Sequence, residues 1–189
     1  HPSFELCAIT SDALAGRALA EVYPAFAGAS DLVFSKHDKS VLADLDVAFL
    51  AVPHTASLAM TPELIAAGTT VIDLSADYRL KDPAIYEKWY KVAHTSTDLL
   101  AKAAFGLPEL TGDELASAAA RRAAGEAVLV ACAGCYPTAT SLAAAPFLRA
   151  GLVEEGATVI VDALSGITGA GKKATERTHF CFVNESVEA

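Results

Sequence analysis

The chain has 189 residues, of which 53% are hydrophobic and 20% are charged, a balance typical of a globular protein rather than a disordered one. Its 14 basic and 23 acidic side chains give a net charge of −9, which argues against nucleic acid or an anionic membrane surface as a partner. No apolar run is as long as a membrane span. The four cysteines are too sparse for a disulfide scaffold, so we expect a reducing, cytoplasmic environment.

Strand and helix patterns alternate along the chain. Short apolar runs predict strands at residues 4–10, 46–52, 70–74, 127–131 and 157–164. Helical periodicity predicts helices at residues 13–22, 55–67, 83–90, 115–124 and 138–150. The segment FGLPEL (105–110) carries turn residues, and we expect it to be a loop or turn. The alternation predicts an α/β fold with a doubly wound, mostly parallel sheet.

Cys135 lies in the segment CAGCYPTA, between a predicted strand and a predicted helix. The free N–H groups and positive dipole at a helix N-terminus stabilise a thiolate, and Gly134 permits a tight turn just before it. A nucleophilic cysteine needs this arrangement. Spacing alone favours a plainer interpretation, a buried cysteine that only packs. With Cys132 the segment also reads C-x-x-C, so a redox pair or half of a zinc site stays open, with His179 and Cys181 as weak further ligands.

Two other regions carry residues that could bind a ligand. The glycine- and lysine-containing segment SGITGAGKK (165–173) matches neither the Walker A motif nor the G-x-G-x-x-G fingerprint of dinucleotide-binding proteins. Polar residues also follow the predicted strands, at Thr10, Ser11, His54 and residues 75–77. Ligands of open parallel sheets bind beyond the carboxyl ends of the strands. Each of these residues taken alone is more simply explained as a helix cap or turn residue.

Five segments together resemble the N-acetyl-γ-glutamyl-phosphate reductase family, whose members are relatives of aspartate-semialdehyde dehydrogenase. They are VPH (52–54), DLSADYRL (73–80), GLPEL (106–110), GCYPTA (134–139) and SGITGAGKK (165–173). The segments follow the family's order through essentially the whole chain. The combination of DLSADYRL with GCYPTA favours this family over its aspartate-semialdehyde relative.

The resemblance implies an NADP-binding Rossmann domain over residues 1–134 and the beginning of an α+β catalytic and dimerisation domain over residues 135–189. It implies NADPH-dependent reduction of N-acetyl-glutamyl 5-phosphate to the semialdehyde, in arginine biosynthesis, through a thioester on Cys135. It places the cofactor against Thr10, Ser11, Pro53, His54, Ser165, Gly166, Gly169 and Ala170. It also implies a homo-oligomer, either a dimer or a tetramer. An aspartate-semialdehyde dehydrogenase-like enzyme and an inactive folding or interaction unit stay as alternatives.

The chain departs from the family pattern in three ways. The family's usual Asn-Pro-Gly-Cys is replaced by Cys132-Ala133-Gly134-Cys135. The family's first strand and glycine-rich loop would precede residue 1, and its acid/base histidine would follow residue 189, a role that His179 does not match. We therefore expect these residues to be an internal piece of a longer reductase. By themselves they should bind NADP poorly and lack the general acid/base.

Overall fold

A computed structural model of the chain describes residues 2–42 and 44–171. The predicted features at Lys172, Lys173, His179 and Cys181 lie outside these ranges. The chain divides into two compact units, His1–Gly134 and Cys135–Ala189. Every helix in the described ranges is too short or too polar to cross a lipid bilayer.

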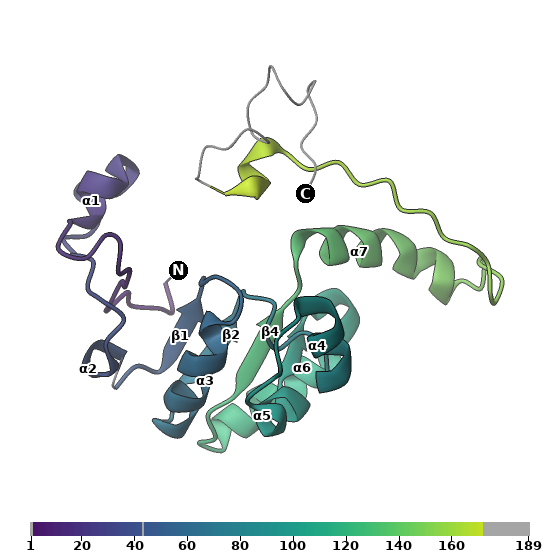
Figure 1. The fold of residues 1–189 in the computed structure, drawn as a ribbon, viewed down its shortest axis with the longest axis horizontal. Helices are drawn as coiled ribbons and strands as arrows, with labels where there is room; N and C mark the ends of the chain where they lie inside the picture. The colour runs from purple at the N-terminus through teal and green to yellow at the C-terminus, as the bar shows by residue number, and fades with distance from the viewer. Residues whose placement is uncertain (1, 43, 172–189) are drawn as a thin grey trace. The chain divides into compact units, whose positions relative to one another are not determined.

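A parallel sheet of four strands lies at the centre of the first unit (Figure 1). The strands are β1 (Val47–Leu50), β2 (Thr70–Asp73), β3 (Ala104–Gly106) and β4 (Leu129–Cys132), in the order β1-β2-β4-β3. Val47 of β1 lies opposite Thr70 of β2, and Val71 of β2 lies opposite Leu129 of β4. Because all the pairs are parallel, the carboxyl ends of the four strands meet at one edge of the sheet.

Helices connect these strands, as the sequence pattern predicts. The longer helices of the first unit are α3 (Ala56–Ala66), α4 (Pro83–Tyr90), α5 (Thr97–Lys102) and α6 (Pro108–Ala123). Its short helices are α1 (Leu19–Val22), η1 (Pro24–Phe26) and α2 (Lys39–Leu42). The second unit contains α7 (Cys135–Arg149) and the 3-10 helix η2 (Ile167–Ala170). The predicted α/β fold with a parallel sheet is confirmed.

Helix α4 shows how local sequence sets an element's bounds. It begins at Pro83, whose ring suits the first helical turn, and the side chain of Asp82 caps it by accepting a hydrogen bond from the Ala84 N–H at 2.8 Å. It ends where Lys91 adopts a left-handed conformation, with φ of 61°. These local signals explain why the predicted range, 83–90, matches the observed helix.

The core lies between the sheet and its covering helices. Helix α3 packs on β2, and α6 packs on β3 and β4. The buried cluster comprises Ala48, Leu50, Leu58, Leu64, Val71, Tyr78, Tyr86, Leu100, Ala103, Leu129 and Ala131. Two of its members, Tyr78 and Tyr86, come from the segment after β2, so this segment folds into the core beside the carboxyl edge of the sheet.

Two predicted strands do not form among the described residues. In residues 4–10 only Thr10 pairs, through a single bridge to Ser35, and residues 157–164 have no strand partner. Side chains of the second run are exposed, with Ile160 at 88% and Leu164 at 95%. An apolar β-type run becomes a strand only where a neighbouring strand accepts and donates its backbone hydrogen bonds, and the described residues place none beside these runs.

Three other expectations need correction. The predicted loop 105–110 instead contains the end of β3 and the first turn of α6. The predicted helix 13–22 is reduced to α1, Leu19–Val22, because turns occupy the residues before it. Helix α5, Thr97–Lys102, was not expected, since its sequence is polar and short; burial of Leu100 secures it against the core.

Candidate functional site

The turn between β1 and α3 carries two of the predicted cofactor-binding residues, Pro53 and His54, at the carboxyl edge of the sheet. Both side chains are exposed, and the His54 ring lies 5.6 Å from the ring of Tyr90. The next residue, Thr55, has φ of 72° and ψ of −21°, a conformation that a β-branched residue rarely adopts. Its backbone N–H donates to Oδ1 of Asp77 at 3.0 Å.

Beneath this turn lies a buried polar network formed by Ser57 of α3 and the DLSADYRL segment. Ser57 Oγ lies 3.1 Å from Asp73 Oδ2, 2.9 Å from Ser75 Oγ and 2.8 Å from Asp77 Oδ2. Ser75 donates to Asp73 through its N–H and its hydroxyl, each at 2.9 Å. Burial raises the pKa of the Asp73 carboxyl, and the hydrogen bonds from the two serines only partly oppose that shift.

Asp77 also binds two aromatic side chains. The Tyr86 hydroxyl donates to Asp77 Oδ1 at 2.8 Å, and His94 Nε2 donates to the Asp77 carbonyl at 3.0 Å. Because His94 Nδ1 accepts from the Ser96 N–H at 3.1 Å, the ring is the neutral tautomer that carries its proton on Nε2. Burial accordingly lowers the pKa of His94, and it raises that of Tyr86, where the bond to Asp77 acts in the same direction.

The end of β4 is held from two sides, by Arg79 in the segment after β2 and by Gly106 of β3. Arg79 donates from Nε to the Cys132 carbonyl at 2.7 Å and from Nη2 to the Leu74 carbonyl at 2.8 Å. On the other side, the Ala133 N–H donates to the Gly106 carbonyl of β3 at 3.4 Å. A Cβ at Gly106 would lie 3.1 Å from the Cys132 Cα, so only glycine lets β3 approach this closely. This packing sets where the chain leaves the sheet, three residues before Cys135.

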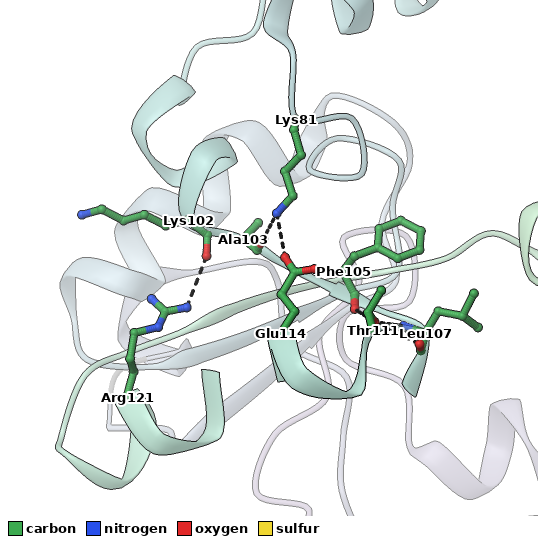
Figure 2. A network of polar contacts seen from close by, with 8 residues as sticks. All are labelled: Lys81, Lys102, Ala103, Phe105, Leu107, Thr111, Glu114 and Arg121. Carbon is green, nitrogen blue, oxygen red and sulfur yellow. Dashed lines mark hydrogen bonds and ion pairs between the residues drawn. The ribbon is translucent and has the colours of Figure 1, made fainter. Parts of the chain in front are cut away.

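Side-chain bonds hold β3 itself in place (Figure 2). The hydroxyl oxygen of Thr111, at a kink in α6, lies 2.6 Å from the Phe105 carbonyl oxygen and 2.9 Å from the Leu107 carbonyl oxygen, and its single proton can be donated to either. Lys81 Nζ donates to the Ala103 carbonyl and pairs with Glu114 at 3.0 Å. Thr111 and Lys81 therefore hold the strand that flanks the end of β4.

The two cysteines of CAGCYPTA have different surroundings. Cys132 is half-buried; burial, reinforced by Asp73, raises the pKa of its thiol, while Arg79 acts in the opposite direction. Cys135 is exposed and is the first residue of the fifteen-residue helix α7, in the second unit. Within the part of the chain that the structure describes, no three His, Cys, Asp or Glu side chains gather in a way that could hold a metal ion.

Thr10 and Ser11 lie beside residues 35–37 in another part of the first unit. Thr10 Oγ1 lies 2.8 Å from His37 Nδ1, and the Ser11 N–H donates to the Ser35 carbonyl at 2.8 Å. The His37 N–H in turn donates to Asp12 Oδ1 at 3.1 Å. Sequence patterns did not indicate His37, because it is 27 residues from Thr10 and only the fold brings the two together.

The four remaining predicted cofactor residues lie together in a single turn of the second unit, around η2. Its hydrogen bonds run from the Gly169 N–H to the Gly166 carbonyl at 2.9 Å and from the Ser165 hydroxyl to the same carbonyl at 3.3 Å. Ala170 is the last residue of η2. A Cβ at Gly169 would lie 2.7 Å from Ser165 Oγ, so a larger residue there would require the exposed serine side chain to rotate away.

Residues 1–118 match the family model of the semialdehyde dehydrogenase NAD-binding domain. The chain belongs to the semialdehyde dehydrogenase family. Residues 135–189 match the dimerisation domain of these dehydrogenases. Across the whole chain, proteins named N-acetyl-γ-glutamyl-phosphate reductase from Janthinobacterium sp. (strain Marseille) and Saccharophagus degradans are 42% and 43% identical. The resemblance seen in the five motifs is thereby confirmed.

The chain spans about half the length of these curated relatives, 52% of each. Among solved structures, it resembles the aspartate semialdehyde dehydrogenase of Candida albicans, crystallised with NADP, with a TM-score of 0.50. That likeness covers 78% of this chain and 41% of the other at 14% sequence identity, so it supports the fold alone.

Proposed function

We propose that the chain is the cofactor-binding part and the beginning of the catalytic part of an NADPH-dependent reductase. Its substrate would be N-acetyl-glutamyl 5-phosphate and its product the semialdehyde, a step of arginine biosynthesis in the cytoplasm. The observation that carries the proposal is the position of Cys135, exposed on the first residue of α7 directly after β4. The identity of 42–43% to proteins named for this reaction supports the choice of substrate.

In this proposal Cys135 is the nucleophile. Cys135 lies at the N-terminus of α7, and it attacks in its thiolate form. The thiolate attacks the acyl carbon of the acyl phosphate, a C–S bond forms, and the C–O bond breaks so that phosphate leaves with the electron pair. The product is a thioester on Cys135. Reduction of the thioester expels the thiolate and releases the aldehyde.

NADPH, when bound, supplies the hydride for that reduction. The residues fit such a group by their chemistry, since the hydroxyls of Thr10 and Ser11 and the imidazole of His54 can bond to phosphate and ribose oxygens. In the second unit, the turn from Ser165 to Ala170 contains Gly166 and Gly169, whose backbone carries no side chain, which suits the approach of a flat nicotinamide ring. We assign the dinucleotide to these residues, with the boundary between the two domains at Gly134 and Cys135.

Substitution of the nucleophile tests the proposal in the protein at its full length. We expect Cys135→Ser to lower the rate of semialdehyde oxidation with NADP⁺ and phosphate, the reverse reaction, by at least about 10³-fold. Cys7→Ser is the matched control, because Cys7 is exposed in the first unit and takes no part in the mechanism. A substrate comparison should favour N-acetylglutamate semialdehyde over aspartate semialdehyde. Full activity in Cys135→Ser would refute the proposal.

Thiol labelling gives a second test that does not depend on turnover. Iodoacetamide at pH 7, followed by peptide mass spectrometry, should modify Cys135 well before Cys132. The half-buried Cys132 is shielded, and burial raises the pKa of its thiol, so less reactive thiolate is present. Labelling of Cys132 first would contradict the assignment of the nucleophile.

Residues 135–189 match a dimerisation domain, and this match leads us to propose a homodimer joined through these residues, which light scattering would detect.

A further inference from the structure

The β1–α3 turn holds a strained residue that needs an explanation. Thr55 is β-branched, yet its φ is 72°, and left-handed backbone is costly for any residue with a Cβ. A conformation of this kind persists only when the surrounding structure imposes it, and such residues cluster at binding sites. The structure supplies one restraint in the bond from the Thr55 N–H to Asp77 Oδ1, at 3.0 Å.

Asp77 is well placed to impose this conformation. Its carboxylate is fully buried, and both oxygens are bonded, Oδ1 to the Thr55 N–H and the Tyr86 hydroxyl, Oδ2 to the Ser57 hydroxyl. Ser57 belongs to α3, the helix that the turn leads into. The buried carboxylate therefore joins the turn, its following helix and α4 at one point, and its charge strengthens each hydrogen bond.

Asp77 is also linked to His54 through two aromatic side chains, those of Tyr86 and Tyr90. The Tyr86 ring stacks on the Tyr90 ring at a centroid distance of 4.8 Å, and the Tyr90 ring lies 5.6 Å from that of His54. Asp77 thus restrains the backbone just after His54 directly, and it fixes Tyr86, which stacks on the Tyr90 ring beside His54. Both restraints act on the dipeptide Pro53–His54, while the exposed side chains of that dipeptide stay open to a ligand.

We propose that Asp77 is a positioning residue for the dinucleotide: its carboxylate holds Thr55 left-handed and so presents Pro53 and His54 to the cofactor. This inference rests on the proposed function, because it takes NADPH to be the ligand of the turn. Asp77 itself is buried beneath the turn and acts only through Thr55 and Tyr86.

The test is NADPH binding, followed by nucleotide fluorescence, in the protein at its full length. Asp77→Ala should weaken binding about tenfold, equivalent to about 1.4 kcal/mol. Without the carboxylate, most molecules would no longer hold the turn in the conformation that binds NADPH. Adding Thr55→Gly to that variant should restore most of the affinity, since glycine adopts positive φ without steric cost. Thr55→Gly alone should bind like the wild type. Asp73→Asn is the matched control: it alters a buried acid of the same network that does not contact Thr55.

Several results would overturn the proposal. Wild-type affinity in a folded Asp77→Ala variant, or no recovery on adding Thr55→Gly, would show that Asp77 only stabilises the fold. If Asp77→Ala does not fold, Asp77→Asn keeps one acceptor oxygen for the Thr55 N–H and should bind NADPH within about threefold of the wild type. Hydrogen exchange on the wild type is a further check, and an unprotected Thr55 amide would contradict the bond. If the wild type does not bind NADPH at all, the proposed function fails, and this inference fails with it.

Discussion

The most specific prediction about packing concerns Gly106, because β3 packs closely against the end of β4 at this residue. A Cβ there would lie 3.1 Å from the Cys132 Cα, 3.1 Å from Val130 Cγ1 and 3.3 Å from the Ala131 carbonyl oxygen. All three contacts are closer than ordinary van der Waals contact, so β4 would have to move by a few tenths of an ångström. Two of the three atoms are backbone atoms of a strand paired on both sides, which resists that movement.

We therefore expect Gly106→Ala to lower the free energy of unfolding by about 1 to 3 kcal/mol, the usual cost of overpacking. Gly112→Ala is the matched control. Gly112 lies inside α6, where an added Cβ would meet no atom within 4 Å, and alanine there should raise stability by about 0.5 to 1 kcal/mol. Urea titrations followed by circular dichroism would measure both. If the two variants shift stability in the same direction, the close approach of β3 to β4 is not what requires glycine at 106.

Two further predictions concern the polar side chains of Thr111 and Asp73. Thr111→Val removes the hydroxyl that donates to the Phe105 carbonyl, and the free energy of unfolding should fall by about 1 to 2 kcal/mol in a urea titration; an unchanged midpoint would mean that other donors replace it. Burial raises the pKa of Asp73, so the native carboxyl keeps its proton at pH values where the unfolded chain has released it. Its contribution to stability is full below the ordinary value of 3.8 and is lost as the pH rises through the raised, folded-state value. Asp73→Asn should remove this pH dependence from unfolding measured between pH 4 and 8, whereas Asp46→Asn, at an exposed position, should not. Equal slopes for the wild type and Asp73→Asn would contradict the shift.

Local sequence determined the parts of this protein that depend on near neighbours. The ranges of α3 and α4, and of β1, β2 and β4, follow from short apolar runs, caps and glycine stops, whose signals lie within a few residues of each element. Cys135 follows a strand and starts a helix, as its neighbours predict, but its spacing alone favoured a buried cysteine, and the fold leaves it exposed. The family could also be identified from sequence, because five motifs in the family's order are far more specific than any one motif alone.

Long-range packing decided the rest. The run at 4–10 has every local property of a strand, but strand formation needs a partner backbone, which no local pattern supplies. Asp77 looks like an ordinary polar residue in the sequence, and its importance appears only when the fold places its carboxylate under Thr55, 22 residues away. Gly106 is likewise one glycine among twelve until β3 meets β4. Hydrogen-bonding capacity and shape are properties of each residue, whereas the partner that satisfies them is chosen by the tertiary structure.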